Sequence, residues 1–226
     1  MFTVLHSDKN LIIINKPSGI VVHPFDHSDE ITLIDEIEKN FPECFSFENK
    51  KTLQDGRVVN LGGLVHKLDR DTSGVLVITK NKTTYDELAS LFTSHKIKKT
   101  YVALGEGVIQ EEKIIIDAPL GRNKKEYKNV AYPKNPRGEL LPALTELVVT
   151  QRYKDITLVT LSPHTGRTHQ LRAHMAHINH PIVGDVAYGA TKKDGRIMLH
   201  ASQISFSLNG KSYSFEARAP EAFYGS

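Results

Sequence analysis

Short apolar runs separated by turn residues follow one another along most of the chain. Each run is rich in Val, Ile, Leu, Thr or Tyr, which is the pattern of a β-strand. The runs lie at residues 2–5, 11–15, 75–78, 101–104, 113–116, 143–151, 156–161, 203–208 and 212–217. The turn at residues 7–10 predicts a hairpin, and Asn209-Gly210, a strong two-residue turn signal, predicts another near the C-terminus. The pattern predicts a protein built mainly of short strands.

Two segments in the first half of the chain show a helical repeat instead. Residues 31–40 place apolar side chains at helical spacing. Residues 83–95 do the same, with Asn81 or Thr83 as the N-cap. The stretch between these helices, residues 43–63, is polar and contains glycine, so we expect a loop there.

Composition then limits the class of protein. The chain has 226 residues, 39% hydrophobic and 24% charged, so we expect one domain, or two tightly joined lobes, around a sizeable core. It shows no leader and no apolar run of membrane-spanning length, so we expect a cytoplasmic protein without a membrane segment. Cys44 is the only cysteine, which excludes an internal disulfide and a cysteine-rich metal site. The net charge of +3 is too small to identify a nucleic-acid partner by itself.

The richest chemistry lies in residues 65–80. Asp69 and Asp71 stand among cationic side chains and are followed by Gly74 and a β-branched run, which predicts a loop that turns at Gly74 into a buried strand. A carboxylate held at the mouth of a strand beside cations would be ionised, and it could act as a nucleophile or as a base. Spacing alone favours a plainer interpretation, in which Asp69, Asp71 and Thr72 form a hydrogen-bonded turn.

The sequence His-Lys-Leu-Asp-Arg-Asp-Thr-Ser-Gly at residues 66–74 resembles the active-site motif of RluA-type pseudouridine synthases. In that family the Asp of Leu-Asp is the single essential carboxylate, and the resemblance maps it to Asp69. The match departs at Lys67, where the family usually carries an Arg that helps to displace the target base. Lysine keeps the positive charge but lacks the planar, stacking guanidinium group.

Two further segments resemble the same family. Residues 15–24 are similar to its first motif, an Asn-Lys-Pro-Ser-Gly turn that packs beneath the active site. The sequence Lys-Lys-Thr-Tyr-Val-Ala at residues 98–103 is similar to its second element, whose Tyr stacks on the target uracil and is a candidate for moving a proton. We map that Tyr to Tyr101, since stacking on a base is worth about 1–3 kcal/mol. Without the resemblance, a Tyr packed in a strand would be the better interpretation.

A third motif lies at residues 162–181. There Leu171, Met175 and Ile178 form a stripe at helical spacing, so we expect a helix that begins at Arg167. The segment resembles the family's Thr-Gly-Arg-x-His-Gln-Leu-Arg element, whose first Arg pairs with the essential Asp. The resemblance therefore makes Arg167 the partner of Asp69, which it would keep ionised and oriented.

The RNA contacts that we expect come from cations near these motifs and from one basic run. Residues 122–137 hold six Lys or Arg against one acid, with two Tyr interleaved. Such a run is usually a solvated loop, but in an RNA enzyme it is the expected backbone-binding surface. Some of the residues predicted to bind RNA lie off the core-facing stripe of the third motif. The whole set is Lys67, Arg70, Lys98, Lys99, Arg122, Lys124, Lys125, His169 and Arg172.

Two other functions compete with this interpretation. Five histidines between residues 164 and 180 raise the possibility of a metal hydrolase, but the segment lacks a His-Glu-x-x-His motif and a nearby Cys, so ordinary hydrogen-bonding histidines are favoured. A noncatalytic RNA-binding protein on the same fold would not need Asp69, Tyr101 and Arg167 together. We therefore expect an enzyme, with no metal and no cofactor.

The resemblance spans residues 15–201 and implies an α+β fold, with a mixed, mainly antiparallel sheet, flanking helices and a central RNA-binding cleft. The many strands and few helices predicted above agree with it. We expect a single catalytic domain over residues 1–226 without the S4-type RNA-binding module that often precedes it. The implied activity is isomerisation of uridine to pseudouridine in tRNA or rRNA, and we expect a monomer.

Overall fold

The computed structural model describes residues 2–224 except residues 26, 124–128, 132–135 and 192–194. The chain forms two compact units. Unit 1 comprises Met1–Ile97 and Ile204–Ala217, and unit 2 comprises Lys98–Gln203 and Arg218–Ser226. Strand β13 (Leu199–Leu208) therefore contributes its first half to unit 2 and its second half to unit 1.

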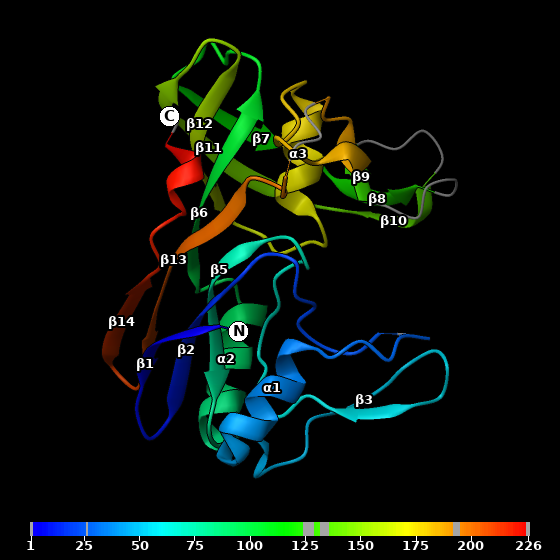
Figure 1. The fold of residues 1–226 in the computed structure, drawn as a ribbon, viewed down its shortest axis with the longest axis vertical. Helices are drawn as coiled ribbons and strands as arrows, with labels where there is room; N and C mark the ends of the chain where they lie inside the picture. The colour runs from blue at the N-terminus through cyan, green and yellow to red at the C-terminus, as the bar shows by residue number, and fades with distance from the viewer. Residues whose placement is uncertain (1, 26, 124–128, 132–135, 192–194, 225–226) are drawn as a thin grey trace. The chain divides into compact units, whose positions relative to one another are not determined.

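Unit 1 is a small sheet with two helices and one separate hairpin (Figure 1). Its strands follow the order β1-β2-β5-β13, and β14 pairs with β13. In addition to β13, its elements are β1 (Thr3–Ser7), β2 (Leu11–Lys16), α1 (Leu33–Asn40), the 3-10 turn η1 (Pro42–Phe45), β3 (Lys50–Thr52), β4 (Val58–Asn60), β5 (Ser73–Thr79), α2 (Lys82–Thr93) and β14 (Lys211–Glu216).

Burial explains the central strands of unit 1. Every residue of β5 is buried, and so are the four apolar residues that begin β2. Both strands read as apolar runs because they are covered on both faces. Helix α2 packs Leu88 against Val75 and Val77 of β5. Its predicted N-cap is confirmed, since Asn81 Oδ1 accepts a hydrogen bond from the Thr84 amide at 3.0 Å.

The expectation of a loop over residues 43–63 is wrong in part. Strands β3 and β4 form an antiparallel hairpin there, with Lys51 opposite Val59. All three side chains of β3 are exposed. A strand with no buried face lacks the alternation of apolar and polar residues, so the hydrophobic pattern could not reveal it.

Unit 2 contains the part of the nine-stranded sheet in the order β13-β6-β12-β11-β7, and a three-stranded sheet in the order β10-β8-β9. Besides the first half of β13, its elements are β6 (Lys98–Glu106), β7 (Lys113–Asp117), β8 (Leu120–Asn123), β9 (Asn129–Ala131), β10 (Pro136–Leu141), β11 (Leu144–Arg152), β12 (Ile156–Pro163), α3 (Gln170–His177), η2 (Val186–Tyr188) and η3 (Glu221–Phe223).

Strand β8 also departs from the sequence expectation. The basic run at residues 122–137 has the composition of a solvated loop, but β8 begins at Leu120 and pairs with β9 and β10. The basic run therefore contains β9, the end of β8 and the start of β10. Lys124 and Lys125, both expected to bind RNA, lie outside the described residues, as does the rest of 124–128 and 132–135.

The core of unit 2 lies between α3 and the sheet. Leu171 and Met175 of α3 belong to one buried cluster with Ala103, Leu104 and Leu161. A close approach makes this packing possible: a Cβ added to Gly105 would lie 2.8 Å from Met175 Cε. Gly105 therefore leaves room for the end of the Met175 side chain, which would have to shift if a Cβ stood there.

The predicted fold class is confirmed. The sheets are mainly antiparallel and are accompanied by few helices, which is an α+β arrangement. The single catalytic domain over residues 1–226 stays a prediction. Within the described part of the chain, no helix is long and apolar enough to cross a membrane.

Candidate active-site loops

Residues 65–72, here the Asp69 loop, lead into β5 in unit 1. Asp69 is half-buried, and its carbonyl oxygen accepts a hydrogen bond from the Thr72 amide at 3.2 Å. Gly74 has a φ of 119°, a conformation that residues with a Cβ rarely adopt. The predicted passage from a loop into a buried strand is confirmed, but the strand begins at Ser73, one residue before Gly74. The backbone of the loop forms a hydrogen-bonded turn as well.

A second turn, residues 16–20 or the Lys16 turn, holds the Asp69 loop by its backbone. Lys16 is 0% exposed, and its Nζ donates to the carbonyl oxygens of Pro17, Ile20 and Arg70, each at 2.8 Å. The Gly19 amide donates to the same Arg70 oxygen at 2.9 Å. Ser18 Oγ donates to the Asp71 carbonyl oxygen at 2.7 Å.

The two residues after Asp69 are therefore fixed from a segment some fifty residues earlier in the chain. The first-motif turn was expected to pack beneath the active site, and it contacts the Asp69 loop directly. The sequence interpretation missed the part played by Lys16. Its signal was a lysine at the end of a strand that begins with four apolar residues, where a buried cation needs several acceptors.

His66 is also part of the scaffold of this loop. Its Nε2 accepts a hydrogen bond from the Val77 amide at 3.0 Å, which requires an unprotonated Nε2. The ring stacks on Phe92 of α2, with ring centroids 4.7 Å apart. Both contacts tie the start of the Asp69 loop to β5 and α2.

The two cations beside Asp69 have different surroundings. The exposed guanidinium of Arg70 makes a bidentate pair with Glu30, with N···O distances of 2.8 and 2.7 Å. Lys67 is exposed and forms no ion pair with any residue that the structure describes. Of these two predicted RNA-binding residues, Lys67 has the less compensated charge.

In unit 2, Tyr101 lies on β6 opposite Leu161 of β12. Its side chain is half-buried and packs against the edge of the unit 2 core. At the start of the same strand Lys98 is exposed, whereas Lys99 Nζ contacts the Thr165 carbonyl oxygen at 3.4 Å. Burial lowers the pKa of Lys99. Lys99 thus supports the turn that carries Arg167.

That turn, residues 163–170 or the Arg167 turn, is organised by Gln170, which is only 4% exposed. Gln170 Oε1 accepts from Thr165 Oγ1 at 2.7 Å and from the Arg167 amide at 3.0 Å. Its Nε2 donates to the Leu144 carbonyl oxygen and to Thr145 Oγ1, both at 3.0 Å. The half-buried side chain of Arg167 donates from Nε to the Pro142 carbonyl oxygen at 3.1 Å.

Gln170 is a second positioning residue that the sequence interpretation missed. It stands in the Thr-Gly-Arg-x-His-Gln motif, and that position was its only signal. An amide both donates and accepts, so this one side chain can satisfy the amide and hydroxyl groups of the turn and the groups on β11 together.

The third motif departs from expectation in two further ways. Helix α3 begins at Gln170 rather than at Arg167, because the Arg167 amide bonds to the Gln170 side chain and His169 has a left-handed φ of 55°. Arg172 was expected to lie off the core-facing stripe and to bind RNA, but it is only 8% exposed. Its Nε and Nη2 donate to Asp185 at 2.7 and 2.8 Å.

Arg172 also lies over the Tyr188 ring, 4.9 Å from its centroid. Its guanidinium group is used inside unit 2, so we remove Arg172 from the RNA-binding set. His169, another member of that set, is half-buried, with Nδ1 3.1 Å from the Tyr188 hydroxyl.

Of the histidines that suggested a metal site, His169, His174 and His180 make ordinary hydrogen bonds. His174 is fully buried between Thr145 Oγ1 at 2.9 Å and the Ala118 carbonyl oxygen at 3.0 Å. Since a carbonyl only accepts, Nε2 carries the proton; burial is the main cause that lowers the pKa of this ring. His180 Nδ1 lies 2.7 Å from the Glu106 carbonyl oxygen. Over the described ranges, no three His, Cys, Asp or Glu side chains are grouped to hold a metal ion.

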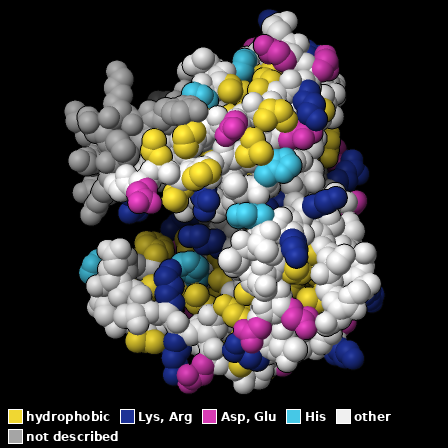
Figure 2. Space-filling view, turned by 180° about the vertical axis from the view of Figure 1, so that it is seen from behind, with side chains coloured by type: hydrophobic (Ala, Val, Ile, Leu, Met, Phe, Trp, Pro, Cys, Tyr) yellow, Lys and Arg dark blue, Asp and Glu magenta, His cyan; other side chains and the backbone are white. Residues whose placement is uncertain are grey.

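Charge is mixed on the surface that Figure 2 shows. Lys and Arg side chains lie there among Asp, Glu and His side chains, so that face is not uniformly basic. Arg122, predicted to bind RNA, is exposed on β8. Any RNA contact on this face has to come from local groups of cations rather than from one large basic face.

The protein has an α+β fold. Its Asp69 loop and its Arg167 turn each carry one motif residue on a backbone that hydrogen bonds hold in place. Comparison with known proteins gives the family: the profile of the RNA pseudouridylate synthase family matches residues 10–177. The chain belongs to this family and, within it, to the RluA type. Members of the family are isomerases that act on RNA.

Two relatives and one solved structure illustrate the likeness. An uncharacterized RNA pseudouridine synthase of Bacillus subtilis is 32% identical over 223 residues, which cover 96% of this chain and 69% of the relative. Ribosomal large subunit pseudouridine synthase D of Borreliella burgdorferi is 33% identical over 225 residues, 97% of this chain and 66% of the relative. The structure of human RNA pseudouridylate synthase domain containing 1 matches with a TM-score of 0.77 and 25% identity, over 96% of this chain and 83% of that one. The chain spans about two thirds of the length of these two curated relatives.

Proposed function

We propose that this chain is an RNA pseudouridine synthase that isomerises specific uridines in tRNA or rRNA, with Asp69 as its single essential carboxylate. The observation that carries the proposal is the way the Asp69 loop is held. Hydrogen bonds from Lys16, Ser18 and Gly19 fix the carbonyl groups of the next two residues. A carboxylate that must meet one atom of a flipped nucleotide needs a rigid backbone of this kind.

The reaction requires the target uridine to leave the RNA stack, because its reacting atoms are buried there otherwise. Asp69 then acts by one of three routes: attack on the ribose, attack on the uracil, or removal of a ribose proton. The uracil detaches, rotates and rejoins the ribose through carbon. The bond broken and the bond made belong to one substrate, so the proposal includes no cofactor and no metal.

Two residues of unit 2 complete the proposed catalytic set. The family resemblance gives Tyr101 the role of stacking on the uracil ring and makes Arg167 the partner of the Asp69 carboxylate. Two observations support these roles. Tyr101 is half-buried at the edge of the core, and Gln170 holds the backbone of Arg167, so each side chain extends from a fixed position.

The proposed RNA-binding residues are Lys67, Arg70, Lys98, Lys99, Arg122, Lys124, Lys125 and His169. We propose further that residues 1–226 form one catalytic domain that works as a monomer in the cytoplasm.

The test is the pseudouridine content of RNA after incubation with the protein. Unmodified tRNA and rRNA fractions are treated separately with the wild-type chain and with Asp69→Ala, and pseudouridine is measured by mass spectrometry. We expect pseudouridine in one fraction with the wild type only. Its appearance with both proteins would show that Asp69 is the wrong residue. Its absence from both fractions with both proteins would favour a noncatalytic RNA-binding protein.

A further inference from the structure

Lys99 of β6 is a half-buried cation with few hydrogen-bond partners. Its Nζ lies 3.4 Å from the Thr165 carbonyl oxygen, which is longer than the roughly 2.7–3.2 Å of an ordinary N–H···O bond. No other hydrogen bond or ion pair of this ammonium group occurs within the described part of the chain. Burial also lowers its pKa. An ammonium group carries three N–H donors, so most of the hydrogen-bonding capacity of Lys99 is left over.

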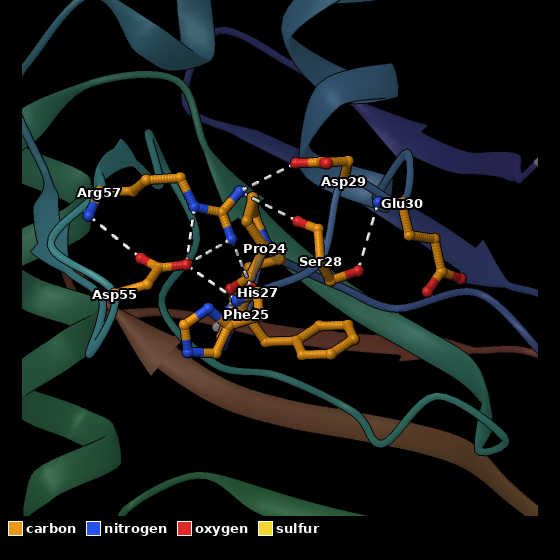
Figure 3. A network of polar contacts seen from close by, with 9 residues as sticks. Pro24, Phe25, His27, Ser28, Asp29, Glu30, Asp55 and Arg57 are labelled. Carbon is orange, nitrogen blue, oxygen red and sulfur yellow. Dashed lines mark hydrogen bonds and ion pairs between the residues drawn. The ribbon is translucent and has the colours of Figure 1, made fainter.

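The cations that stabilise the fold of unit 1 are partnered more fully. Lys16 Nζ donates to three carbonyl oxygens, each at 2.8 Å. Figure 3 shows Arg57, which donates to two carbonyl oxygens at 3.0 and 2.9 Å and to Asp55 Oδ2 at 2.9 Å. A cation withdrawn from water without such partners costs stability. Where a protein keeps such a group, a functional role is the usual reason, because a ligand supplies the missing acceptor.

The position of Lys99 indicates which ligand this is. Lys99 and Tyr101 are two residues apart on β6, so their side chains leave the same face of the strand. Tyr101 pairs with Leu161 of β12, and β12 ends two residues later, where the Arg167 turn begins. This register brings Lys99 to that turn: a Cβ added to Gly166 would lie 3.5 Å from Lys99 Nζ. The ammonium group therefore lies beside the backbone just before Arg167, on the strand face that carries Tyr101.

The proposed reaction creates negative charge on the uracil. When the glycosidic carbon–nitrogen bond breaks, its electron pair stays with the uracil and spreads to the two carbonyl oxygens of the ring. After rotation, a ring carbon uses an electron pair to bond the ribose and releases its proton to water, and the ring nitrogen takes a proton from water. The product is therefore an isomer of the substrate. A fixed cation at one carbonyl oxygen lowers the barrier, because it meets the charge where the charge develops.

We propose that Lys99 is a further catalytic residue, whose ammonium group donates a hydrogen bond to a carbonyl oxygen of the target uracil and stabilises the negative charge on the detached ring. The inference rests on the proposed function and deepens it, because it assigns to Lys99 a contact with the reacting base rather than with the RNA backbone. Lysine suits this role, since a compact charge on a flexible stem can follow the oxygen while the ring rotates.

The test compares Lys99→Met with Lys96→Met in the full chain, because Lys96 is exposed just before β6. Single-turnover formation of pseudouridine is measured at saturating concentrations of an unmodified RNA that the wild type modifies, and RNA affinity is measured separately by fluorescence anisotropy. We expect Lys99→Met to lose about a hundredfold in rate or more, which is the usual effect of removing one donor to a developing oxyanion. Its RNA affinity should stay close to that of the wild type, which also shows that the variant is folded. Lys96→Met should keep both values.

A second measurement separates direct contact from an effect through the Arg167 turn. The target uridine is replaced by 2-thiouridine or by 4-thiouridine, because sulfur is a weaker hydrogen-bond acceptor than oxygen. If Lys99 donates to the replaced oxygen, the wild type loses that contact, and the rate ratio of wild type to Lys99→Met should fall toward one for one of the two RNAs. The same ratio for uridine and for both thiouridines would contradict direct contact.

The remaining outcomes are distinguishable. A loss of RNA affinity in Lys99→Met without a loss of the saturating rate would assign Lys99 to the RNA backbone and overturn the inference. Equal rates for Lys99→Met and the wild type would also overturn it, and they would leave the proposed function intact. Absence of pseudouridine with the wild type counts against the proposed function itself, and the inference fails with it.

Discussion

The Asp69 loop of unit 1 and the Arg167 turn of unit 2 are held in different ways. Each carries a motif residue on irregular backbone, and each is fixed by one buried polar side chain, Lys16 or Gln170. The Lys16 contact reaches Arg70, a residue far away in the chain, whereas Gln170 bonds within its own turn and to adjacent β11. The position of Asp69 therefore depends on a contact between residues 54 positions apart in the chain, and that of Arg167 depends on contacts within its own turn and with β11, 25 residues earlier.

The largest effect on this comparison should come from Lys16→Met. The substitution keeps the apolar stem and removes the donor from three carbonyl oxygens, two of them in the Lys16 turn and one in the Asp69 loop. We expect the free energy of unfolding to fall by about 3 kcal/mol or more. Turnover at saturating RNA should fall as well, because the Asp69 loop loses a fixed point. Urea unfolding and single-turnover kinetics measure the two effects.

Lys9→Met is the matched control for that variant, since Lys9 is exposed in the turn between β1 and β2. It should unfold and turn over like the wild type. A Lys16→Met protein as stable as Lys9→Met would contradict the role given to Lys16.

A smaller effect is expected from Gln170→Leu, which leaves the Arg167 amide without its partner. Because neighbouring groups of the turn can find water, we expect a loss of about 2 kcal/mol. Gln151→Leu, at an exposed position of β11, is the control and should change stability little. A lower free energy of unfolding for Gln170→Leu than for Lys16→Met would contradict the expected order of the two effects.

The smallest effect is a dependence of stability on pH that involves one histidine in each unit. The pKa values of His23 and His174 are lowered from 6.5 in the folded chain, in each case mainly by burial. The unfolded chain therefore binds more protons once the pH falls below 6.5, and folding stability decreases there as pH decreases. Above 6.5 this contribution is constant. Each histidine contributes at most about 1.4 kcal/mol per pH unit.

Thermal unfolding between about pH 8 and pH 5 measures this dependence. His174→Gln should flatten the curve below pH 6.5, and His164→Gln, at an exposed position, should not. A wild-type melting temperature that rises as the pH falls below 6.5 would show the opposite sign and contradict the account.

Local signals made part of the fold predictable. The Asn81 cap, the two helices of unit 1 and the hairpin at Asn209-Gly210 follow from residues close together in the chain, and the structure confirms them. The Asp69 loop was found by its resemblance to a motif rather than by its spacing, which favoured a simple turn. The backbone of the Asp69 loop agrees with both interpretations, because it forms a hydrogen-bonded turn and leads into the buried strand β5.

Long-range pairing explains what the sequence did not reveal. Arg172 looked like a surface residue until its partner Asp185 was known, because helical spacing does not show which neighbours cover a helix. Lys16 looked like the polar end of a strand, since its acceptors lie on segments that only the fold brings near. Strand β8 carries Gly and Arg, so its pairing with β9 and β10 left no apolar pattern.

The central proposal is that Asp69, and not Asp71, is the catalytic carboxylate of the loop that the Lys16 turn holds. Single-turnover pseudouridine formation by Asp69→Asn and Asp71→Asn tests it most directly. The two variants remove the same charge, two residues apart in one loop. We expect Asp69→Asn to fall to roughly a thousandth of the wild-type rate or less, since it removes the reacting group. Asp71→Asn should stay near the wild type. Equal losses in both variants, or a larger loss in Asp71→Asn, would contradict the claim.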